Sequence, residues 1–459
     1  MIRPIPANLG GVGFFSPEKL PEFSDQYQEE NVGRYWNYRV TPFFYKWPKK
    51  HQQNKKLVID AFSPNLNKSL HVGHLRQLAL AKSLNELLNF SANRSEQWDV
   101  KEETVASSGN AQFVALLGAS LGVFDYAQKE LNEWFDFLNY HPTIYHDVLM
   151  PQDQHIVPRK KKNVKEKDSE QESEVEVWEG PKGDVIVVRS NGKPTYSFYD
   201  ISFANKVSPT NYITGVEQKE HFENLGLGEK HLPMGLVLGK DNKKIKSRNG
   251  EAATAKEIFE EIQNKIKETK CDKKILSWNI ICWNLLRSNR TQNIKFDIEE
   301  STKPESPGMY ITYTYARCLS ALSNENHNSV YDPDIKKALH ENFEKHSYLN
   351  GYTVSEKWKE DAKNWSRKNP MPAIDMSQED AELIGFAEQS NFYRQKSIES
   401  LDPSLLANFT NELAKKLNGH YQKYKIKDGK YGLKFAFANS VAHLRRCMLD
   451  LGMFCPTEV

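Results

Sequence analysis

The segment at residues 63–76 constrains the fold and the chemistry of this chain more than any other stretch. It reads Ser-Pro-Asn-Leu-Asn-Lys-Ser-Leu-His-Val-Gly-His-Leu-Arg, between an apolar run at residues 57–59 and a long Leu- and Ala-rich segment. This order predicts a strand, a loop and a helix over about residues 73–89. The apolar face of that helix would consist mainly of Leu75, Leu78, Leu84, Leu87 and Leu88. A helix N-terminus binds anions, and two imidazoles flanking Gly73 can donate hydrogen bonds to a phosphate. The segment indicates a phosphate site, and the alternative is a capped helix with surface histidines.

A second motif, at residues 236–250, is a Gly- and Asn-containing loop dense with cations. It reads Leu-Val-Leu-Gly-Lys-Asp-Asn-Lys-Lys-Ile-Lys-Ser-Arg-Asn-Gly. A mobile loop of this composition can close over a triphosphate and stabilise departing pyrophosphate. Taken alone, the same residues are equally consistent with an exposed basic hairpin.

A third motif begins with Tyr196 and Asp200, which lie four residues apart at the start of a predicted helix. Side chains at this spacing face the same way, so Asp200 can pair with a guanidinium while Tyr196 packs against its plane. The structural alternative is an exposed aspartate and a half-buried core tyrosine. A Gly-x-x-Gln pattern, Gly215 to Gln218, follows.

In this order the three motifs resemble those of class I aminoacyl-tRNA synthetases, and of the arginyl branch in particular. Residues 71–74 resemble the HIGH element, and residues 244–248 resemble the KMSKS loop. Ser247 stands where that loop usually has its second lysine, and Lys68 lies where many arginyl enzymes carry a compensating lysine. The resemblance implies an α/β Rossmann-like parallel-sheet catalytic domain followed by an all-α anticodon-binding domain. Strand-like runs alternating with helical patterns independently favour a parallel sheet.

The resemblance also implies a role for each matching residue. Asp60 stands where the family often has Glu, and Glu217 stands where it usually has Asp. Both exchanges keep the negative charge and change the length of the side chain by one methylene group. The implied arginine-binding residues are Asp60, Ser63, Asn65, Tyr196, Asp200 and Gln218. The implied ATP-binding residues are Lys68, His71, Gly73, His74, Gly215, Glu217, Lys246 and Arg248, of which Lys68, His71, His74, Lys246 and Arg248 would be catalytic.

The second half of the chain carries long amphipathic patterns at residues 255–266, 274–286 and 309–322, which predict helices. Tyr313 and Arg317 lie in a stretch similar to the helix that opens the family's anticodon-binding domain, which implies contact with tRNA. Core packing is the alternative for most of these tyrosines. The expected organisation is an N-terminal arm at 1–56, a catalytic domain at 57–250, a helical connector at 251–306 and the anticodon-binding domain at 307–459.

Two stretches stand outside the motifs. Residues 1–56 predict an irregular arm with short helical pieces near 17–29, too short for the family's usual N-terminal domain for the tRNA elbow. A run of mixed charge near 159–176 predicts a solvated, mobile insertion, with RNA contact as the alternative.

Composition narrows the class of protein further. The chain is 39% hydrophobic and 27% charged, with a net charge of +2 and a mean hydropathy of −0.68. It has no apolar run of membrane-spanning length and no signal-peptide pattern, so we expect a cytoplasmic location without membrane association. Five scattered cysteines without a Cys-x-x-Cys pair give no basis for a structural zinc site or a disulfide framework. We expect no metal site in the protein itself.

The resemblance implies the activity of an arginine–tRNA ligase, and we expect a monomer that acts on L-arginine, ATP with Mg²⁺, and tRNA(Arg). One alternative is a paralogue that transfers activated arginine to a different acceptor. The other is a catalytically silent RNA-binding protein, which the presence of Lys68, His71, Gly73 and His74 disfavours.

Overall fold

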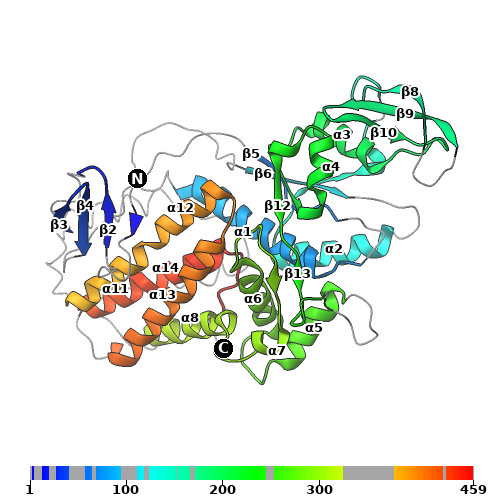
Figure 1. Ribbon diagram of the computed structural model, residues 1–459. Helices are drawn as coiled ribbons and strands as arrows, with labels where there is room; N and C mark the ends of the chain where they lie inside the picture. The colour runs from blue at the N-terminus through cyan, green and yellow to red at the C-terminus, as the bar shows by residue number, and fades with distance from the viewer. Residues whose placement is uncertain are drawn as a thin grey trace, which may run out of the picture. The chain divides into compact units, whose positions relative to one another are not determined.

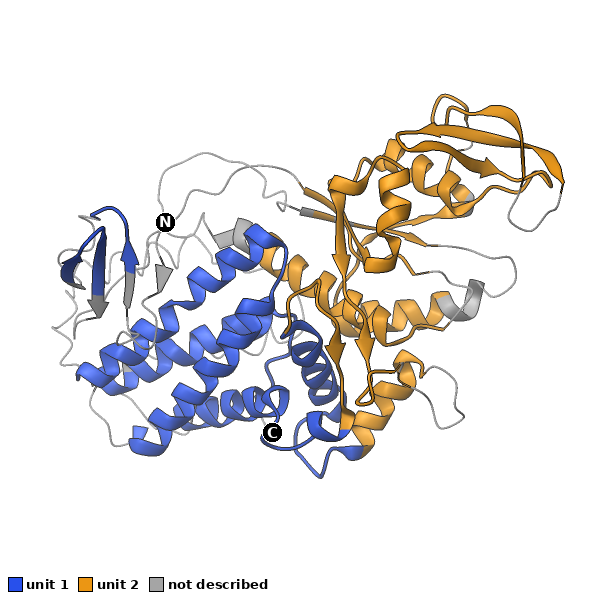
Figure 2. Ribbon diagram, in the orientation of Figure 1, with its two compact units in different colours: residues 1–52, 265–287, 299–459 blue, residues 53–264, 288–298 orange. Residues whose placement is uncertain are grey.

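The computed structural model divides the chain into two compact units, coloured separately in Figure 2. One unit comprises residues 53–264 and 288–298, and the other comprises residues 1–52, 265–287 and 299–459. The structure describes residues 3–4, 13–19, 27–40, 57–64, 69–94, 111–117, 124–151, 153–165, 171–243, 245, 253–323, 377–426 and 431–457. Among the described helices, none is both long and apolar enough to cross a bilayer.

The unit of residues 53–264 and 288–298, which is unit 2 (orange) in Figure 2, is built on a five-stranded parallel sheet. In spatial order its strands are β12 (His231–Met234), β11 (Asn211–Gly215), β5 (Leu57–Asp60), β6 (Ala111–Leu117) and β7 (Thr143–His146). The chain builds outward from β5 in one direction through β6 and β7, and then in the other through β11 and β12. The order therefore reverses between β5 and β11, which is where doubly wound folds bind ligands. The predicted Rossmann-like α/β class is confirmed.

In the described part of this unit, five helices and three short 3₁₀ turns accompany the sheet. The helices are labelled in Figure 1. All five leucines of the predicted apolar face are buried in the helix that follows β5, and this helix packs against β6. An apolar cluster that includes Val114, Phe203 and Phe222 joins the sheet to the helices that follow it. The helices are α1 (Val72–Arg94), α2 (Phe124–Leu138), α3 (Tyr196–Val207), α4 (Lys219–Asn224) and α5 (Ala255–Lys265), and the 3₁₀ turns are η3 (Asp147–Leu149), η4 (Val216–Gln218) and η5 (Gly228–Lys230).

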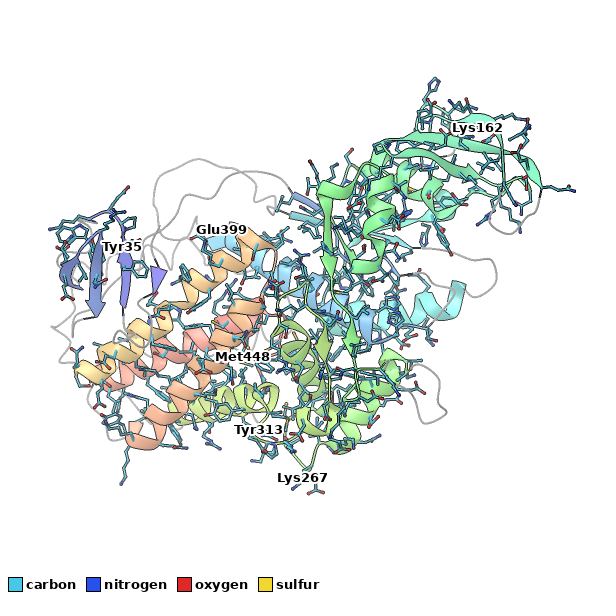
Figure 3. All side chains as sticks on the ribbon, in the orientation of Figure 1. Tyr35, Lys162, Lys267, Tyr313, Glu399 and Met448 are labelled. Atoms are coloured by element: carbon cyan, nitrogen blue, oxygen red, sulfur yellow. The ribbon has the colours of Figure 1, made fainter. Side chains whose placement is uncertain are left out.

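The charged run near 159–176 is not a loop in its described part, which corrects the expectation from composition. It forms antiparallel strands β8 (Lys160–Lys165) and β9 (Glu172–Gly180), joined by β10 (Gly183–Val188). Val175 and Val177 are buried on one face of β9 and alternate with exposed or half-buried glutamates. Ion pairs cross the strands, including Lys161 with Glu174 at 2.7 Å, and Lys162 on the outer strand with Asp184 (Figure 3). The alternation of buried valines with polar glutamates, together with the cross-strand ion pairs, explains why this charged stretch forms a sheet.

The described part of residues 1–56 is also a sheet, in place of the expected irregular arm, and most of the stretch near 17–29 where helical pieces were expected lies outside the described residues. Its strands, in spatial order, are β1 (Arg3–Pro4), β2 (Gly13–Ser16), β4 (Tyr35–Val40) and β3 (Tyr27–Val32), all antiparallel. The turn between β3 and β4 contains Gly33 at φ +64°, a conformation that glycine adopts without strain. Alternating aromatic residues, with Tyr38 fully buried and Tyr35 exposed, explain why this stretch pairs as strands.

The other unit, which is unit 1 (blue) in Figure 2, is mainly helical, as the amphipathic patterns predict. Gly308 lies where two of its helices approach so closely that a Cβ there would stand 2.7 Å from the Cα of Ile280. A fully buried Asp450 pairs with Arg394 at 2.7 Å. Its described helices are α6 (Lys273–Leu286), α7 (Ile298–Ser301), α8 (Pro307–Ser323), α11 (Gln378–Glu388), α12 (Ser390–Ser400), α13 (Ser404–Lys423) and α14 (Tyr431–Asp450), of which α7 spans the boundary between the units. A small parallel strand pair, β13 (Val237–Leu238) with β14 (Ile294–Lys295), belongs to the unit with the parallel sheet.

Candidate active site

A cavity of about 760 Å³ lies at the switch point of the parallel sheet, lined by residues of the unit that contains this sheet. It brings together ten of the residues that the sequence singled out, from segments that span more than 150 positions of the chain. These residues are Asp60, Ser63, His71, Gly73, His74, Tyr196, Asp200, Gly215, Glu217 and Gln218. Asn65, Lys68, Lys246 and Arg248 lie outside the described residues. Tyr313 and Arg317 are on α8 of the other unit.

His71 and His74 form one wall of the cavity, where α1 begins. Their rings stack with centroids 3.9 Å apart and an interplanar angle of 19°. The backbone N–H of His71 donates to Nδ1 of His74, and that of Gly73 donates to Nδ1 of His71, both at 3.1 Å. A ring nitrogen that accepts carries no proton, so both neutral rings hold their proton on Nε2. Burial, and then the neighbouring His71, lower the pKa of His74 to about 3, so this imidazole is neutral at physiological pH.

Gly73 is required by this arrangement. A Cβ at this position would lie 2.9 Å from Cε1 of His71, closer than side chains tolerate. Any larger residue would push the His71 ring out of its stack. The glycine therefore keeps the two imidazoles together at the helix N-terminus, where an anion is stabilised by the helix dipole and by N–H donors.

Asp60 and Ser63 form a second wall, at the carboxyl end of β5. The Ser63 hydroxyl donates to Oδ1 of Asp60, and the backbone N–H of Leu116 donates to Ser63 Oγ at 2.9 Å. Asp60 is 5% exposed, and its burial raises its pKa to about 7. The hydrogen bond from Ser63 opposes this shift, and the charge of Asp200 adds to it. Asp60 and Asp200 thus face one cavity, which Asp147 and Glu217 also line, and this acidic lining suits a ligand with positive charge.

Tyr196 and Asp200 project from the first turns of α3, as their spacing predicts. Tyr196 is 65% exposed, an unusual position for a tyrosine on the wall of a cavity. Asp200 Oδ2 lies 2.7 Å from Nε2 of His221 on α4. Gly215, Glu217 and Gln218 come from the end of β11 and from η4, and the Glu217 carboxylate folds back over Gly215, where a Cβ would stand 2.1 Å from it.

The ends of the basic loop attach beside the histidines. Ile245 and Ala253, which flank the motif's last residues, both line the cavity and are joined by a hydrogen bond of 2.9 Å from Ala253 N–H to Ile245 O. Thr254 forms an isolated antiparallel bridge with His71. Both described ends of this loop therefore lie at the cavity, and its function as a cover for a bound triphosphate stays a prediction.

Three residues at or beside the cavity have a structural importance that the sequence motifs did not assign. His221 and Tyr212 line it, and Arg76 lies buried behind it on α1. His221 follows Gln218 by one helical turn, which is a usable signal. Tyr212 reaches the cavity only through the register of β11 against β5, which no local pattern reveals. Within the described ranges no three His, Cys, Asp or Glu side chains gather to hold a metal ion.

Comparisons with known proteins agree with this geometry. The family described as "tRNA synthetases class I (R), catalytic domain" matches residues 44–100. An arginine–tRNA ligase of Acanthamoeba polyphaga mimivirus is 23% identical over 372 residues, covering 61% of this chain and 61% of that protein. The chain thus spans less than two thirds of the length of this relative.

Solved structures share the fold. Arginyl-tRNA synthetase from Plasmodium falciparum superposes with a TM-score of 0.62 at 13% identity, covering 96% of this chain and 87% of that one. The Thermus thermophilus arginyl-tRNA synthetase gives a TM-score of 0.59 at 15% identity, covering 96% and 90%. In sequence and in fold, the chain is thus similar to class I arginyl-tRNA synthetases.

Proposed function

We propose that this relative of the class I arginyl-tRNA synthetases is an arginine–tRNA ligase. The main observation behind the proposal is that one cavity has an acidic wall and, apart from it, a wall of N–H donors. Asp60 and Asp200 provide an acidic wall, whereas His71 and His74 provide N–H donors at a helix N-terminus. Arginine, with an ammonium and a guanidinium group, is complementary to the first wall, and the phosphates of ATP are complementary to the second.

At the acidic wall, Asp60, Ser63 and Asn65 would bind the α-amino and carboxylate end of arginine. Tyr196, Asp200 and Gln218 would surround the guanidinium, which Asp200 can accept in a bidentate pair. Lysine and citrulline would bind poorly, because neither offers a charged, planar set of N–H donors.

At the other wall, His71, His74 and Lys68 would contact the phosphates, while Gly73, Gly215 and Glu217 would lie against the adenosine. Lys246 and Arg248 would close over the triphosphate from the loop anchored at Ile245 and Ala253. Mg²⁺ would arrive with ATP, since this ion keeps phosphate and water oxygens as its preferred ligands.

Two steps would follow. A carboxylate oxygen of arginine attacks the α-phosphorus, forming an anhydride bond while the bond to pyrophosphate breaks. The terminal ribose hydroxyl of tRNA(Arg) then attacks the arginyl carbonyl carbon, loses its proton, and AMP leaves. The protein would contribute positioning and charge stabilisation without a covalent intermediate.

The helical unit would bind tRNA, as the all-α anticodon-binding domain of the family does. Tyr313 and Arg317 lie one turn apart on α8, and Tyr313 is half-buried while Arg317 is exposed (Figure 3). Aromatic rings and guanidinium planes stack on unpaired bases, which supports this assignment. We further propose a monomer that acts in the cytoplasm, where its substrates are found.

The experiment is arginine-dependent ATP–pyrophosphate exchange with and without tRNA(Arg), together with charging of that tRNA by labelled arginine. Asp200→Asn and His74→Ala should each abolish most of the exchange, and Lys162→Gln on the outer strand β8 is the control that should leave it unchanged. Exchange with charging would support the ligase. Exchange without charging would favour transfer to another acceptor, and no exchange under either condition would overturn the proposal.

A further inference from the structure

Tyr212 stands beside Asp60 at the switch point of the sheet. The two residues are partners in the parallel register of β11 and β5. Side chains at paired positions of neighbouring strands point to the same face of a sheet. Both side chains line the cavity, and Asp200 lines it as well.

The ring of Tyr212 is fixed by packing. The residue is 3% exposed and belongs to the apolar cluster that includes Val114 and Phe203. Its ring centroid lies 5.1 Å from that of Phe222 at an interplanar angle of 47°. A ring packed in this way keeps its hydroxyl group at a fixed position.

The hydroxyl group itself is an unsatisfied polar atom. It is buried, and among the described residues none forms a hydrogen bond with it. Burial and the nearby charges of Asp60 and Asp200 raise the pKa of Tyr212, so the phenol keeps its proton. Buried hydroxyl groups normally have partners, and one without a partner in a ligand cavity indicates a group that the ligand satisfies.

We propose that the Tyr212 hydroxyl oxygen accepts a hydrogen bond from a cationic N–H group of the amino-acid substrate, held between Asp60 and Asp200. This inference rests on the proposed function and adds a binding residue to it. The two carboxylates attract the cation, and the phenol supplies a further acceptor in a fixed direction. A neutral ligand, or one without N–H donors there, leaves the hydroxyl unsatisfied and binds more weakly.

A role in packing alone makes a different prediction for Tyr212→Phe. The substitution keeps the ring and removes only the unsatisfied oxygen, so the thermal midpoint should stay the same or rise. Under our proposal, arginine affinity falls about tenfold in the same variant, as expected for loss of one hydrogen bond to a charged group. In Tyr212→Phe, the affinity for arginine should therefore fall while the thermal midpoint rises or stays the same.

The test measures L-arginine binding by titration calorimetry, and the KM values for arginine and ATP in pyrophosphate exchange, for the full chain and for Tyr212→Phe. Tyr145→Phe is the matched control, because Tyr145 packs against the same cluster and does not line the cavity. We expect a weaker affinity and a higher KM for arginine only in Tyr212→Phe, with the KM for ATP unchanged. Wild-type affinity in Tyr212→Phe, or an equal loss in Tyr145→Phe, would overturn the inference.

A second arm uses 5-guanidinopentanoate, which is arginine without its α-amino group. If the penalty of Tyr212→Phe disappears with this analogue, the ammonium is the donor; if it persists, the guanidinium is. Either result supports the inference and identifies the donor. Failure of the wild-type chain to bind arginine would instead contradict the proposed function, so the two failures are distinguishable.

Discussion

Nε2 of His221 lies 2.7 Å from Oδ2 of Asp200, on the wall of the cavity. The imidazole comes from α4 and the carboxylate from α3, so the contact ties two helices together at the proposed guanidinium site. A carboxylate with one oxygen held in this way presents the other in a fixed orientation. His221 is thus a positioning residue for Asp200.

Replacement of His221 by Phe should raise the KM for arginine by about tenfold, because the variant loses a hydrogen bond to a charged group. The KM for ATP should not change. His221→Gln keeps an N–H donor and should restore much of the affinity. Steady-state pyrophosphate exchange with each substrate varied in turn checks this prediction, and equal increases in both KM values would contradict it.

Arginine binding should depend on pH through Asp60, whose burial raises its pKa to about 7. A cation binds the ionised carboxylate, so affinity should rise with pH and level off above about pH 7. At pH 6, one unit below this pKa, arginine should bind about tenfold more weakly than at pH 8. Calorimetric titration across this range measures the effect.

Asp60→Asn is the control for this pH dependence. It should bind arginine weakly at every pH, with a flatter profile. The same shift has a consequence for folding: because the folded protein holds a proton on Asp60 between about pH 4 and 7, this residue's contribution to the free energy of unfolding falls as pH rises through that window. Dependence on pH that survives in Asp60→Asn would assign the titration to another group.

Much of the parallel-sheet unit could be predicted from local patterns. The apolar run at residues 57–59 and the leucines from Leu75 to Leu88 specify a strand and a helix through their periodicity alone. The alternation of such elements then implies a parallel sheet. Ten of the candidate site residues line one cavity because strand ends and helix N-termini meet at the switch point.

Other features depend on pairing between distant segments, which a single sequence does not reveal. Val175 and Val177 alternate with glutamates whose charge suggested a loop, whereas cross-strand lysines neutralise that charge in the sheet. Tyr212 follows the same logic, since only its register with Asp60 makes it a cavity residue.

Gly308 and Gly419 offer a matched pair of helix substitutions within the helical unit. A Cβ at Gly308 would stand 2.7 Å from the Cα of Ile280, so Gly308→Ala should lower the free energy of unfolding by about 1–3 kcal/mol through overpacking. A Cβ at Gly419 would meet nothing within 4 Å among the described residues, so Gly419→Ala should raise it by about 0.5–1 kcal/mol. Chemical denaturation followed by circular dichroism compares them, and shifts of the same sign would contradict the close approach.

Arg76 is 2% exposed, and its guanidinium group donates to three backbone carbonyl groups of its own unit. Its Nη1 donates to the Gly235 oxygen at 2.6 Å and to the Gln292 oxygen at 2.8 Å, and its Nη2 donates to the Asn289 oxygen at 3.2 Å. These contacts fasten α1, which begins directly after His71 and carries His74, to the residues just before β13 and β14. The chain leads from β13 into the basic loop.

Arg76→Met keeps much of the side-chain volume and removes every donor. It should lower the free energy of unfolding by about 3 kcal/mol, because buried carbonyl groups lose their partners. Arg76→Lys keeps the charge and some of the donors, so its loss in free energy of unfolding should be smaller. The thermal midpoint of the unit with the parallel sheet measures this loss of stability. At a low temperature, where the variant is still folded, its KM for ATP should rise more than its KM for arginine. A variant as stable as the wild type would show that the carbonyl groups find other donors.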